Sequence, residues 1–490
     1  MYTSLNEIKA MAGRGNVVPV CGSILADTET PVTVWMKLFA DTKHSFLLES
    51  VTGGDKVARY SFLGGNPFVT FKSNGMHWDI AGADNERGDG DPLGRLRALL
   101  SRFRAARSPN LPPLCGGAVG YFSYDAVRLY ESIPDKNPKD DRLDEIFFGF
   151  YGDIVAFDNR EHKILLITSI FTDETPDLES AYKDACIRLS AMEEKLTRLL
   201  PSPALSIGEA GPVASNFSRK AYEQAVEKCK DYIKAGDIFQ VVLSQRFTIA
   251  VEANPFDLYR VLRTINPSPY MFYLACEDAH IIGASPEMLV KVENGKIELR
   301  PIAGTHARGL TDEEDAAIER RLKTDPKEIA EHIMLVDLGR NDVGRVSEYG
   351  SVKVEDMMHI EKYSHVMHLV SNISGTLKQG SDALDALFSG FPAGTLSGAP
   401  KIRAMEIIDE QETVRRGLYG GALGYIDFSG NLDSCIVIRT LLYKNNVAYI
   451  QAGAGIVADS VPAKEYDESV SKANALLTAL REAAVLSKKN

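Results

Sequence analysis

Short β-rich runs separated by tight turns dominate the first 200 residues, and this alternation constrains the fold more than any other feature. Turns rich in Gly, Asn and Pro, such as residues 64–67, separate the runs, as expected for strands. Helical patterns do not alternate with them at a regular βαβ period, which disfavours a doubly wound parallel sheet. The runs are Ser45–Ser50, Arg59–Leu63, Phe68–Lys72, Gly117–Tyr124, Phe147–Asp158 and Lys163–Ser169.

The second half of the chain mixes helices and strands. A helix is predicted from the N-cap Ser218 to Ala235, followed by a strand over Phe239–Ile249. Later strands are close in sequence and suggest antiparallel pairing. The predicted pairs are His280–Gly283 with Leu289–Val292, and Gly421–Asp427 with Ser434–Tyr443 and Val447–Gly453. We therefore predict an α+β fold with large antiparallel sheets.

A segment rich in Pro, Gly, Ser and Ala follows a strongly helical stretch, Leu178–Leu200. This composition is typical of a linker. The sequence therefore predicts an N-terminal β-rich region over residues 1–200, a linker over 201–216 and a C-terminal region over 217–490.

Charge and composition exclude several classes of function. The chain has 490 residues with 55 Lys+Arg and 67 Asp+Glu, a net charge of −12, and 44% hydrophobic residues. This is a globular composition, and its acidic balance argues against a general nucleic-acid or membrane-surface binder. One basic cluster recurs at helical spacing, and a solvated helix face explains it better than an RNA contact. Its members are Arg95, Arg97, Arg102, Arg104 and Arg107.

The cysteines and the apolar segments predict a cytoplasmic protein. Six cysteines are scattered without a CxxC pair, as in proteins with reduced thiols. The N-terminus shows no apolar core typical of a signal peptide. The most apolar stretch, Ile146–Phe157, is interrupted by Asp153 and is shorter than the roughly 18 residues of a membrane helix.

Two pairs of glutamates share one spacing. Glu328 and Glu331 lie in DPKEIAEH, and Glu465 and Glu468 lie in PAKEYDES, so each i, i+3 pair would share a helix face. Helix capping and the helix dipole could account for Glu328 and Glu465. They do not account for Glu331 and Glu468, one turn further in. Carboxylates without His or Cys at ligand spacing suit a hard cation such as Mg²⁺.

Glycine-rich turns and isolated polar residues complete the candidate set. Gly304-Thr305, Gly394-Thr395 and Gly453-Ala454-Gly455 could expose backbone amides to an anion, although ordinary turn chemistry also explains each one. No glycine pattern typical of nucleotide binding is present.

Three polar residues stand out against their surroundings. Arg439 lies in the apolar run CIVIRTLLY, where a buried guanidinium needs an anion. His368 could be a structural histidine, and Glu287 could be a surface acid.

In order along the chain, these segments resemble the chorismate-utilising enzymes, and most closely the anthranilate synthase component I group. The resemblance spans nearly the whole chain. It rests on LLES, NPSPYMF, GASPE, RPIAGT, EHIMLVDLGRND, HVMHL, PAGTLSGAPK, GGALGY, QAGAGIV and KEYDES. It implies a layered α/β sandwich with the active site between two large antiparallel sheets. It also implies Mg²⁺-dependent addition of ammonia to C2 of chorismate and elimination of pyruvate to give anthranilate, the first step of tryptophan biosynthesis.

The resemblance assigns roles to individual residues. It implies that residues 1–200 are regulatory and that residues 217–490 bind chorismate and carry out catalysis. Glu331 and Glu468 match the metal ligands, with Glu328 and Glu465 nearby. Glu287 matches a general acid, His368 the residue linked to elimination, and Thr395 an active-site loop. The implied substrate contacts are Gly304, Thr305, Tyr419, Arg439, Gly453, Ala454 and Gly455.

Two positions separate this chain from other branches of the resembled family. Isochorismate and salicylate synthases carry a water-activating lysine at the position of Gln240, which cannot act as a base. Aminodeoxychorismate synthases carry a lysine at the position of Ala303. Ammonia is therefore the expected nucleophile. An enzyme that stops at an aminodeoxychorismate and a catalytically silent tryptophan sensor are the alternatives.

The resemblance also implies regulation and a partner. Ser50 matches a contact to the feedback inhibitor L-tryptophan, with Pro269, Tyr270 and Met271 as the opposing wall. None of the cysteines has the glycine-flanked context of an amidotransferase nucleophile. A separate glutamine amidotransferase subunit is therefore expected to supply ammonia in a hetero-oligomer, which the family resemblance makes a heterotetramer.

Overall fold

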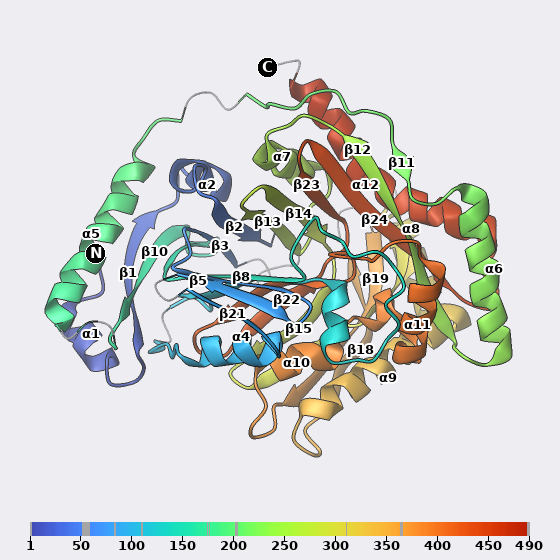
Figure 1. Ribbon diagram of the computed structural model, residues 1–490, viewed down its shortest axis with the longest axis horizontal. Coiled ribbons are helices and arrows are strands. Elements are labelled where there is room, and N and C mark those ends of the chain that lie inside the picture. The colour runs from blue at the N-terminus through green and yellow to red at the C-terminus, as the bar shows by residue number, and fades with distance from the viewer. Residues whose placement is uncertain are drawn as a thin grey trace.

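The computed structural model contains two large antiparallel sheets stacked face to face and covered by helices (Figure 1). It describes residues 2–50, 59–82, 85–108, 111–173, 175, 177–200, 204–309, 311–362 and 366–487. The predicted α+β class and the layered arrangement of two antiparallel sheets are confirmed.

The first sheet, sheet A, combines strands from both ends of the chain. In spatial order its path is β1 (Val17–Leu25), β10 (Lys163–Phe171), β9 (Asp153–Asp158), β3 (Tyr60–Gly65), β2 (His44–Glu49), β13 (Tyr270–Cys276), β14 (Ala279–Ser285), β23 (Thr440–Lys444), β24 (Val447–Ile456), β12 (Gln240–Ala250) and β11 (Ala214–Ser215), with β20 (Gly398–Ala399) also paired to β12.

The second sheet, sheet B, has the same mixed origin. Its path is β17 (Ile302–Ala307), β19 (Val366–Thr376), β16 (Lys296–Leu299), β15 (Met288–Glu293), β22 (Leu432–Ile436), β21 (Ala422–Asp427), β7 (Gly117–Phe122), β8 (Ile146–Tyr151), β4 (Val69–Asn74), β5 (His77–Ala81) and β6 (Glu86–Asp89), with β18 (Lys353–Lys362) on β19.

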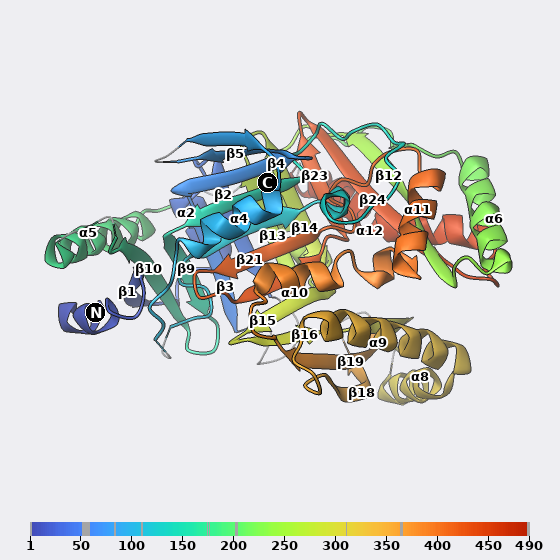
Figure 2. The same ribbon diagram turned by 60° about the horizontal axis from the view of Figure 1, so that its bottom comes forward.

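Helices cover the outer faces and the ends of the sheets (Figures 1 and 2). α5 and α6 lie at opposite ends of the molecule, and α8 and α9 lie with β18 and β19 in a group that projects from one side (Figure 2). The helices are α1 (Leu5–Met11), α2 (Pro31–Leu38), α4 (Pro92–Ser101), α5 (Leu178–Leu196), α6 (Arg219–Ala235), α7 (Pro255–Ile265), α8 (Asp312–Thr324), α9 (Pro326–Val346), α10 (Ala383–Gly390), α11 (Lys401–Gln411) and α12 (Pro462–Ser487), with 3₁₀ turns η1 (Tyr124–Leu129) and η2 (Gly394–Leu396).

Each sheet is continuous across the predicted regions. In sheet A, β2 pairs with β13, and in sheet B, β7 pairs with β21. The strands that precede and follow the predicted linker therefore share both sheets. The division into a regulatory and a catalytic region stays a prediction.

Strand β13 shows how the sequence supports this layering. Its alternate residues Met271 and Tyr273 pack in a core that includes apolar residues of α7 and α12. Phe272 and Leu274 face the other way, into the core between the two sheets, which also contains Leu423 of sheet B. Because both faces are buried, the strand is apolar throughout instead of alternating with polar residues.

Three predicted strands or pairs are wrong because the chain passes from one sheet to the other. The run 147–158 is divided between β8 in sheet B and β9 in sheet A. The predicted pair 280–283 with 289–292 does not form, since β14 lies in sheet A and β15 in sheet B. The run 434–443 is divided between β22 and β23 in the same way.

The predicted helix start at Ser218 is confirmed, and α9 begins with a similar cap. The Ser218 hydroxyl accepts a hydrogen bond from the Ala221 amide, which caps α6 as expected. The Asp325 side chain accepts from the amides of Lys327 and Glu328 at the start of α9. Within the described residues, no helix combines the length and the apolar character needed to cross a membrane.

Candidate active site

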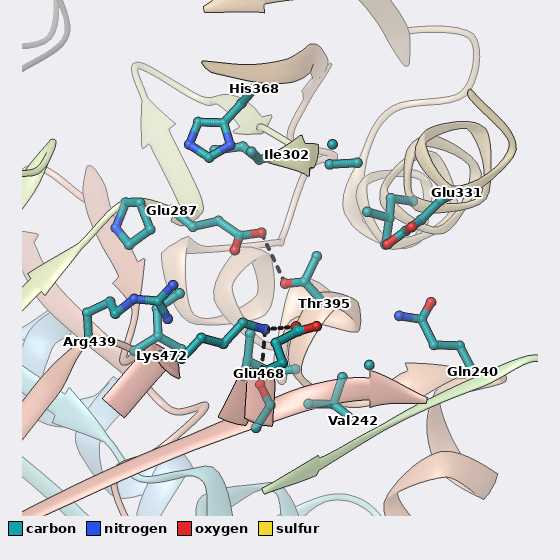
Figure 3. Close-up of a pocket in the computed structure, with 18 of the residues that line it drawn as sticks. Gln240, Val242, Glu287, Ile302, Glu331, His368, Thr395, Arg439, Glu468 and Lys472 are labelled. Atoms are coloured by element: carbon teal, nitrogen blue, oxygen red, sulfur yellow. Dashed lines mark hydrogen bonds and ion pairs between the residues drawn. The ribbon is translucent and has the colours of Figure 1, made fainter. Parts of the chain in front are cut away.

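A cavity of about 900 Å³ lies where the C-terminal strands of the two sheets meet helices α9 and α12. Figure 3 shows side chains entering it from several elements. Most of the predicted site residues line it, so the structure brings these sequence motifs together. Those that do are Gly304, Glu287, Glu328, Glu331, His368, Thr395, Tyr419, Arg439, Gly453, Gly455, Glu465 and Glu468, with Gln240, Ala303 and Pro269.

Glu287 lies where the chain leaves β14 in sheet A and enters β15 in sheet B. Its Oε1 accepts a hydrogen bond from the Thr395 hydroxyl at 3.0 Å (Figure 3). Burial raises the pKa of Glu287 to about 7, and the hydrogen bond from Thr395 and the charge of Arg439 oppose that rise. A carboxyl with this pKa is partly protonated at neutral pH and can donate a proton.

Arg439 lies at a second crossing, between β22 in sheet B and β23 in sheet A. Its backbone adopts a left-handed conformation with φ of 50°, which is uncommon outside glycine. Burial lowers the pKa of the guanidinium, and Tyr419, Glu468 and Glu287 partly offset this. The desolvated charge remains cationic at neutral pH and suits an anionic ligand.

The two crossings are joined by hydrogen bonds. The Ser285 hydroxyl donates to the Ile436 carbonyl at 2.7 Å, and the Ile436 amide donates to the Glu287 carbonyl at 3.0 Å. The Ala284 amide donates to the Arg439 carbonyl at 3.1 Å. Glu287 and Arg439 are therefore fixed through the backbone of both sheets.

His368 extends from β19 into the cavity, near Glu287 in Figure 3. The side chain is buried. Burial, with a contribution from the charge of Arg439, lowers the pKa of His368 to about 4. The imidazole is thus neutral at pH 7, and an anion bound near Arg439 would raise its pKa.

Glycines form part of the cavity wall. A Cβ at Gly455 would lie 2.8 Å from Gln240 Nε2, and a Cβ at Gly453 would lie 2.4 Å from the Leu243 carbonyl. Gly304 has a φ of 55°, and a Cβ there would approach Glu328 Oε2 at 3.0 Å. A side chain would clash with strand β12 at Gly453 and with the Gln240 side chain at Gly455, so both positions of the wall favour glycine.

Three further predicted contacts have different surroundings. Tyr419 lines the cavity, and burial raises its pKa to about 12. The Ala454 side chain packs in a core cluster, so its methyl group does not face the cavity. Thr305 belongs to β17, and its side chain lies outside the described residues.

The glutamates come from two helices. Glu331 on α9 and Glu468 on α12 extend into the cavity from opposite sides (Figure 3), and Glu328 and Glu465 line it too. Loss of water raises the pKa of Glu331, and the charges of Glu328 and Glu468 raise it further. Burial also raises the pKa of Glu465. Within the described part of the chain, no three His, Cys, Asp or Glu side chains are grouped closely enough to hold a metal ion.

Sequence reasoning missed Lys472. Its Nζ lies 2.6 Å from Glu468 Oε1 and donates to the Gly453 carbonyl at 3.0 Å (Figure 3). The signal was present in the sequence, because Glu468 and Lys472 are spaced i, i+4 on one helix face.

The predicted inhibitor contacts lie beside the cavity. β2 ends at Glu49, which pairs in register with Met271 of β13, and Ser50 follows directly. Pro269 lines the cavity, and the Tyr270 hydroxyl donates to Asp433 Oδ1 at 3.1 Å.

The carboxylate of the LLES motif has a structural role that the sequence did not reveal. Glu49 is buried and accepts hydrogen bonds from Arg263 at 2.9 and 3.0 Å and from the Tyr259 hydroxyl. This bidentate pair fixes the end of β2 against α7. The position of Ser50 therefore depends on the ion pair of a buried carboxylate one residue away.

Comparison with known proteins identifies the family. Residues 44–478 match the family described as chorismate binding enzyme. The chain belongs to this family, since the match covers far more than half of its length.

Curated relatives of this chain share one name within the family. The chain is 49% identical to "Anthranilate synthase component 1" of Acetivibrio thermocellus over 98% of this chain and 99% of that protein. It is 47% identical to the protein of the same name from Pseudomonas aeruginosa, over 97% of this chain and 98% of that protein. The resemblance found from the motifs is thereby confirmed.

Solved structures agree with the fold. Anthranilate synthase component I from Streptococcus pneumoniae has a TM-score of 0.77 at 39% identity, covering 92% of this chain and 98% of that one. The menaquinone-specific isochorismate synthase MenF from Escherichia coli has a TM-score of 0.71 at 19% identity, covering 97% and 98%. The second comparison supports the shared fold alone.

Proposed function

We propose that this chain is the chorismate-converting component of an anthranilate synthase. It would add ammonia to C2 of chorismate with loss of the C4 hydroxyl as water, and then eliminate pyruvate to give anthranilate, the first step of tryptophan biosynthesis. The observation that carries the proposal is the pairing, in one cavity, of a carboxyl with a pKa of about 7 at Glu287 with the buried guanidinium of Arg439.

The charges of the cavity suit a small dianion. Arg439 provides a desolvated cation for one carboxylate of chorismate, and Gly453 and Gly455 form part of the wall of the same cavity. The Tyr419 hydroxyl, which stays protonated at neutral pH, can donate to the bound anion. These groups bind and orient the substrate without changing their own protonation.

Loss of the C4 hydroxyl needs a proton, and Glu287 is the group suited to supply it. Its carboxyl is protonated in part of the molecules at pH 7, whereas an ordinary glutamate is almost fully ionised. The Thr395 hydroxyl holds Oε1, which favours presentation of the other oxygen toward the substrate.

Elimination of pyruvate requires removal of the proton at C2. His368 is neutral at pH 7 and can accept a proton, and a dianion beside Arg439 would make it more basic. With a pKa of about 4, the imidazole of the ligand-free protein is a weak base. The proposed role persists because the ligand supplies the missing negative charge.

We also propose that Glu331 and Glu468 hold Mg²⁺, with Glu328 and Glu465 nearby. The donor set fits a hard cation, since all four are carboxylates. Burial, and then the charges of Glu328 and Glu468, raise the pKa of Glu331. The described residues supply too few grouped donors for a closed cage. Water and a substrate carboxylate would complete the coordination, which is typical of Mg²⁺. When bound, the ion would neutralise that carboxylate.

Ammonia is the proposed nucleophile, supplied by a separate glutamine amidotransferase subunit in a hetero-oligomer. Gln240 lines the cavity and has no basic group that could activate water. Ala303 also lines it, so a covalent route through a lysine at that position is closed.

L-Tryptophan is the proposed feedback inhibitor, bound near Ser50, Tyr270 and Met271. The register of β2 with β13 and the position of Pro269 on the cavity wall support a link between such a site and chorismate binding. A ligand that displaced Pro269 would change the shape of the cavity directly.

The test of the reaction is incubation of the pure chain with chorismate, Mg²⁺ and ammonium. Anthranilate fluorescence and pyruvate should rise in equal amounts. Accumulation of an aminodeoxychorismate without pyruvate would favour the alternative enzyme, and no consumption of chorismate would contradict both. Glutamine should not replace ammonium until the amidotransferase subunit is added.

A further inference from the structure

A fully buried ion pair lies behind the cavity wall. The side chains of Arg416 and Glu412 are 1% and 2% exposed, and Arg416 Nη2 lies 2.7 Å from Glu412 Oε1. Arg416 Nε also donates to Glu412 Oε2 at 3.0 Å. Neither residue lines the cavity, so neither is placed to contact the substrate.

The remaining donors of Arg416 reach two segments that do line the cavity. Nη1 donates to the Leu396 carbonyl at 2.6 Å, directly after Thr395. Nη2 donates to the Val242 carbonyl at 2.7 Å, two residues after Gln240 in β12. The guanidinium thus bridges the η2 turn and the end of β12.

Two aromatic rings and a strand complete this environment. The guanidinium carbon lies 5.5 Å from the ring centroid of Tyr419, which lines the cavity, and 4.8 Å from that of Tyr124. Glu412 Oε1 accepts from the Ser244 amide at 2.9 Å and from its hydroxyl at 2.7 Å. The ion pair therefore contacts the η2 turn, strand β12 and Tyr419 together.

Stability alone does not explain such a pair. Removing two charges from water is costly, and apolar residues of similar volume often give equal or greater stability. What apolar residues cannot do is hydrogen-bond the two wall carbonyls and fix the tyrosine ring in one geometry.

We propose that Arg416, held by Glu412, is a positioning residue that sets the geometry of the η2 turn, the Gln240 end of β12 and Tyr419 for the reaction. This inference rests on the proposed function. Because the η2 turn carries Thr395, the ion pair also acts on Glu287 through the Thr395 hydroxyl. A shift of about 1 Å in such a wall can reduce catalysis by about 10²-fold.

The pH dependence gives a readout that general destabilisation would not change. Glu287 faces Arg439 and the Thr395 hydroxyl, and both lower its pKa against the effect of burial. If the η2 turn moves and this hydrogen bond is lost, the pKa of Glu287 rises. The fall of kcat/KM for chorismate on the alkaline side of its pH profile, the basic limb, then moves to higher pH.

The test compares two double variants that exchange a buried ion pair for apolar residues. Glu412→Leu with Arg416→Met removes the proposed positioning pair. Asp409→Leu with Arg128→Met is the matched control, because that pair is also close, at 2.7 Å, with side chains 2% and 14% exposed. Neither control residue lines the cavity.

We expect the Glu412/Arg416 variant to lose about 10²-fold in kcat/KM for chorismate and to show the shifted basic limb, at constant free ammonia. The control should stay within about twofold of wild type with an unchanged limb. Arg416→Lys, which keeps the charge but not the planar donor geometry, should fall between them. It also serves as the test variant if the double variant does not fold.

A folded Glu412/Arg416 variant, or a folded Arg416→Lys variant, with wild-type kcat/KM and an unchanged limb would overturn the inference. An inert wild-type protein would instead contradict the proposed function. In that case chorismate affinity, measured by calorimetry, replaces the rate. Weaker binding in the Arg416 variants with unchanged binding in the control supports positioning, and equal binding in all of them refutes it.

Discussion

Two sides of the same cavity are built in different ways. Glu287 and Arg439 lie at chain crossings between the sheets, and the two crossings are hydrogen-bonded to each other. Glu331 and Glu468 extend from helices, and the Glu468 side chain is 49% exposed and paired with Lys472. The crossing side is fixed by backbone, whereas the helix side is held by side chains.

This difference separates preorganised groups from groups that a ligand must complete. A residue fixed by two sheets costs little reorganisation when the substrate binds, which is the condition for electrostatic catalysis. On the helix side, loss of water and then the charges of Glu328 and Glu468 raise the pKa of Glu331, and a cation would relieve the repulsion between these carboxylates. The crossing side should therefore act in the same way with or without metal, and the helix side should not.

The largest expected effect is on the helix side. Glu331→Gln and Glu468→Gln should each lower turnover by more than about 10³-fold, because each removes a charged ligand from a site without nitrogen or sulfur donors. Calorimetry should show the loss of Mg²⁺ binding directly. Glu482→Gln, at an exposed position of the same helix α12, is the control and should bind Mg²⁺ normally. Near-normal rates at saturating Mg²⁺ in both site variants would refute the metal assignment.

The next effect concerns the second chemical step, the elimination of pyruvate. His368→Met should still consume chorismate and ammonia but should slow pyruvate release by about 10²-fold, since a general base typically contributes 10²–10⁴ in rate. Chromatography of the products should show the aminated intermediate. A histidine with a packing role alone would weaken both steps together, and pyruvate at the wild-type ratio to chorismate consumed would exclude the catalytic role.

A smaller effect is expected beside the cavity. Substitution of Ser50 by Ala should weaken inhibition by L-tryptophan by about 5–150-fold, the range of a coupling of about 1–3 kcal/mol, and leave the uninhibited rate within about twofold. Inhibition curves with and without the substitution measure this. A wild-type chain that binds no tryptophan in calorimetry would remove the regulatory proposal.

The smallest effect is on the free energy of unfolding of the metal-free protein. The pKa of Glu331 is raised in the folded protein, so the unfolded state releases this proton at a lower pH than the folded state does. The free energy of unfolding therefore falls as pH rises above about 4.3, the ordinary glutamate pKa. Glu331→Gln should remove this loss of stability, because glutamine does not titrate.

Solvent screens a partly exposed carboxylate. The free energy of unfolding of Glu331→Gln should therefore exceed that of wild type by less than about 1 kcal/mol at pH 7. Chemical denaturation of metal-free wild type and variant at pH 4 and pH 7 measures the difference. A variant that is less stable than wild type at pH 7 would show that Glu331 is not electrostatically strained.

The sequence predicted the fold class and most of the cavity because its motifs contain the residues that face the ligand. It did not predict the crossings at residues 286–287 and 437–439. The flanking strands are buried on both faces, so their apolar pattern continues across the change of sheet without a break. A short connection then resembles a hairpin turn, although the two strands lie in different sheets.

The missed residues depend on tertiary contacts. Lys472 belongs to the site only because α12 packs beside β24, which brings its ammonium group to the Gly453 carbonyl. The pKa of His368 is low because β19 places it in a desolvated cavity near Arg439, a long-range effect that no local pattern carries. Glu49 is likewise paired with Arg263 through the packing of β2 against α7.

The central claim is that the crossing side supplies a preorganised acid, and the pH dependence of kcat/KM for chorismate tests it most directly. At constant free ammonia, wild type should lose activity as pH rises through about 7, because Glu287 must be protonated to act. Glu287→Gln should be about 10³-fold slower and show no such limb. A glutamine variant with the wild-type rate and the same basic limb would contradict the account.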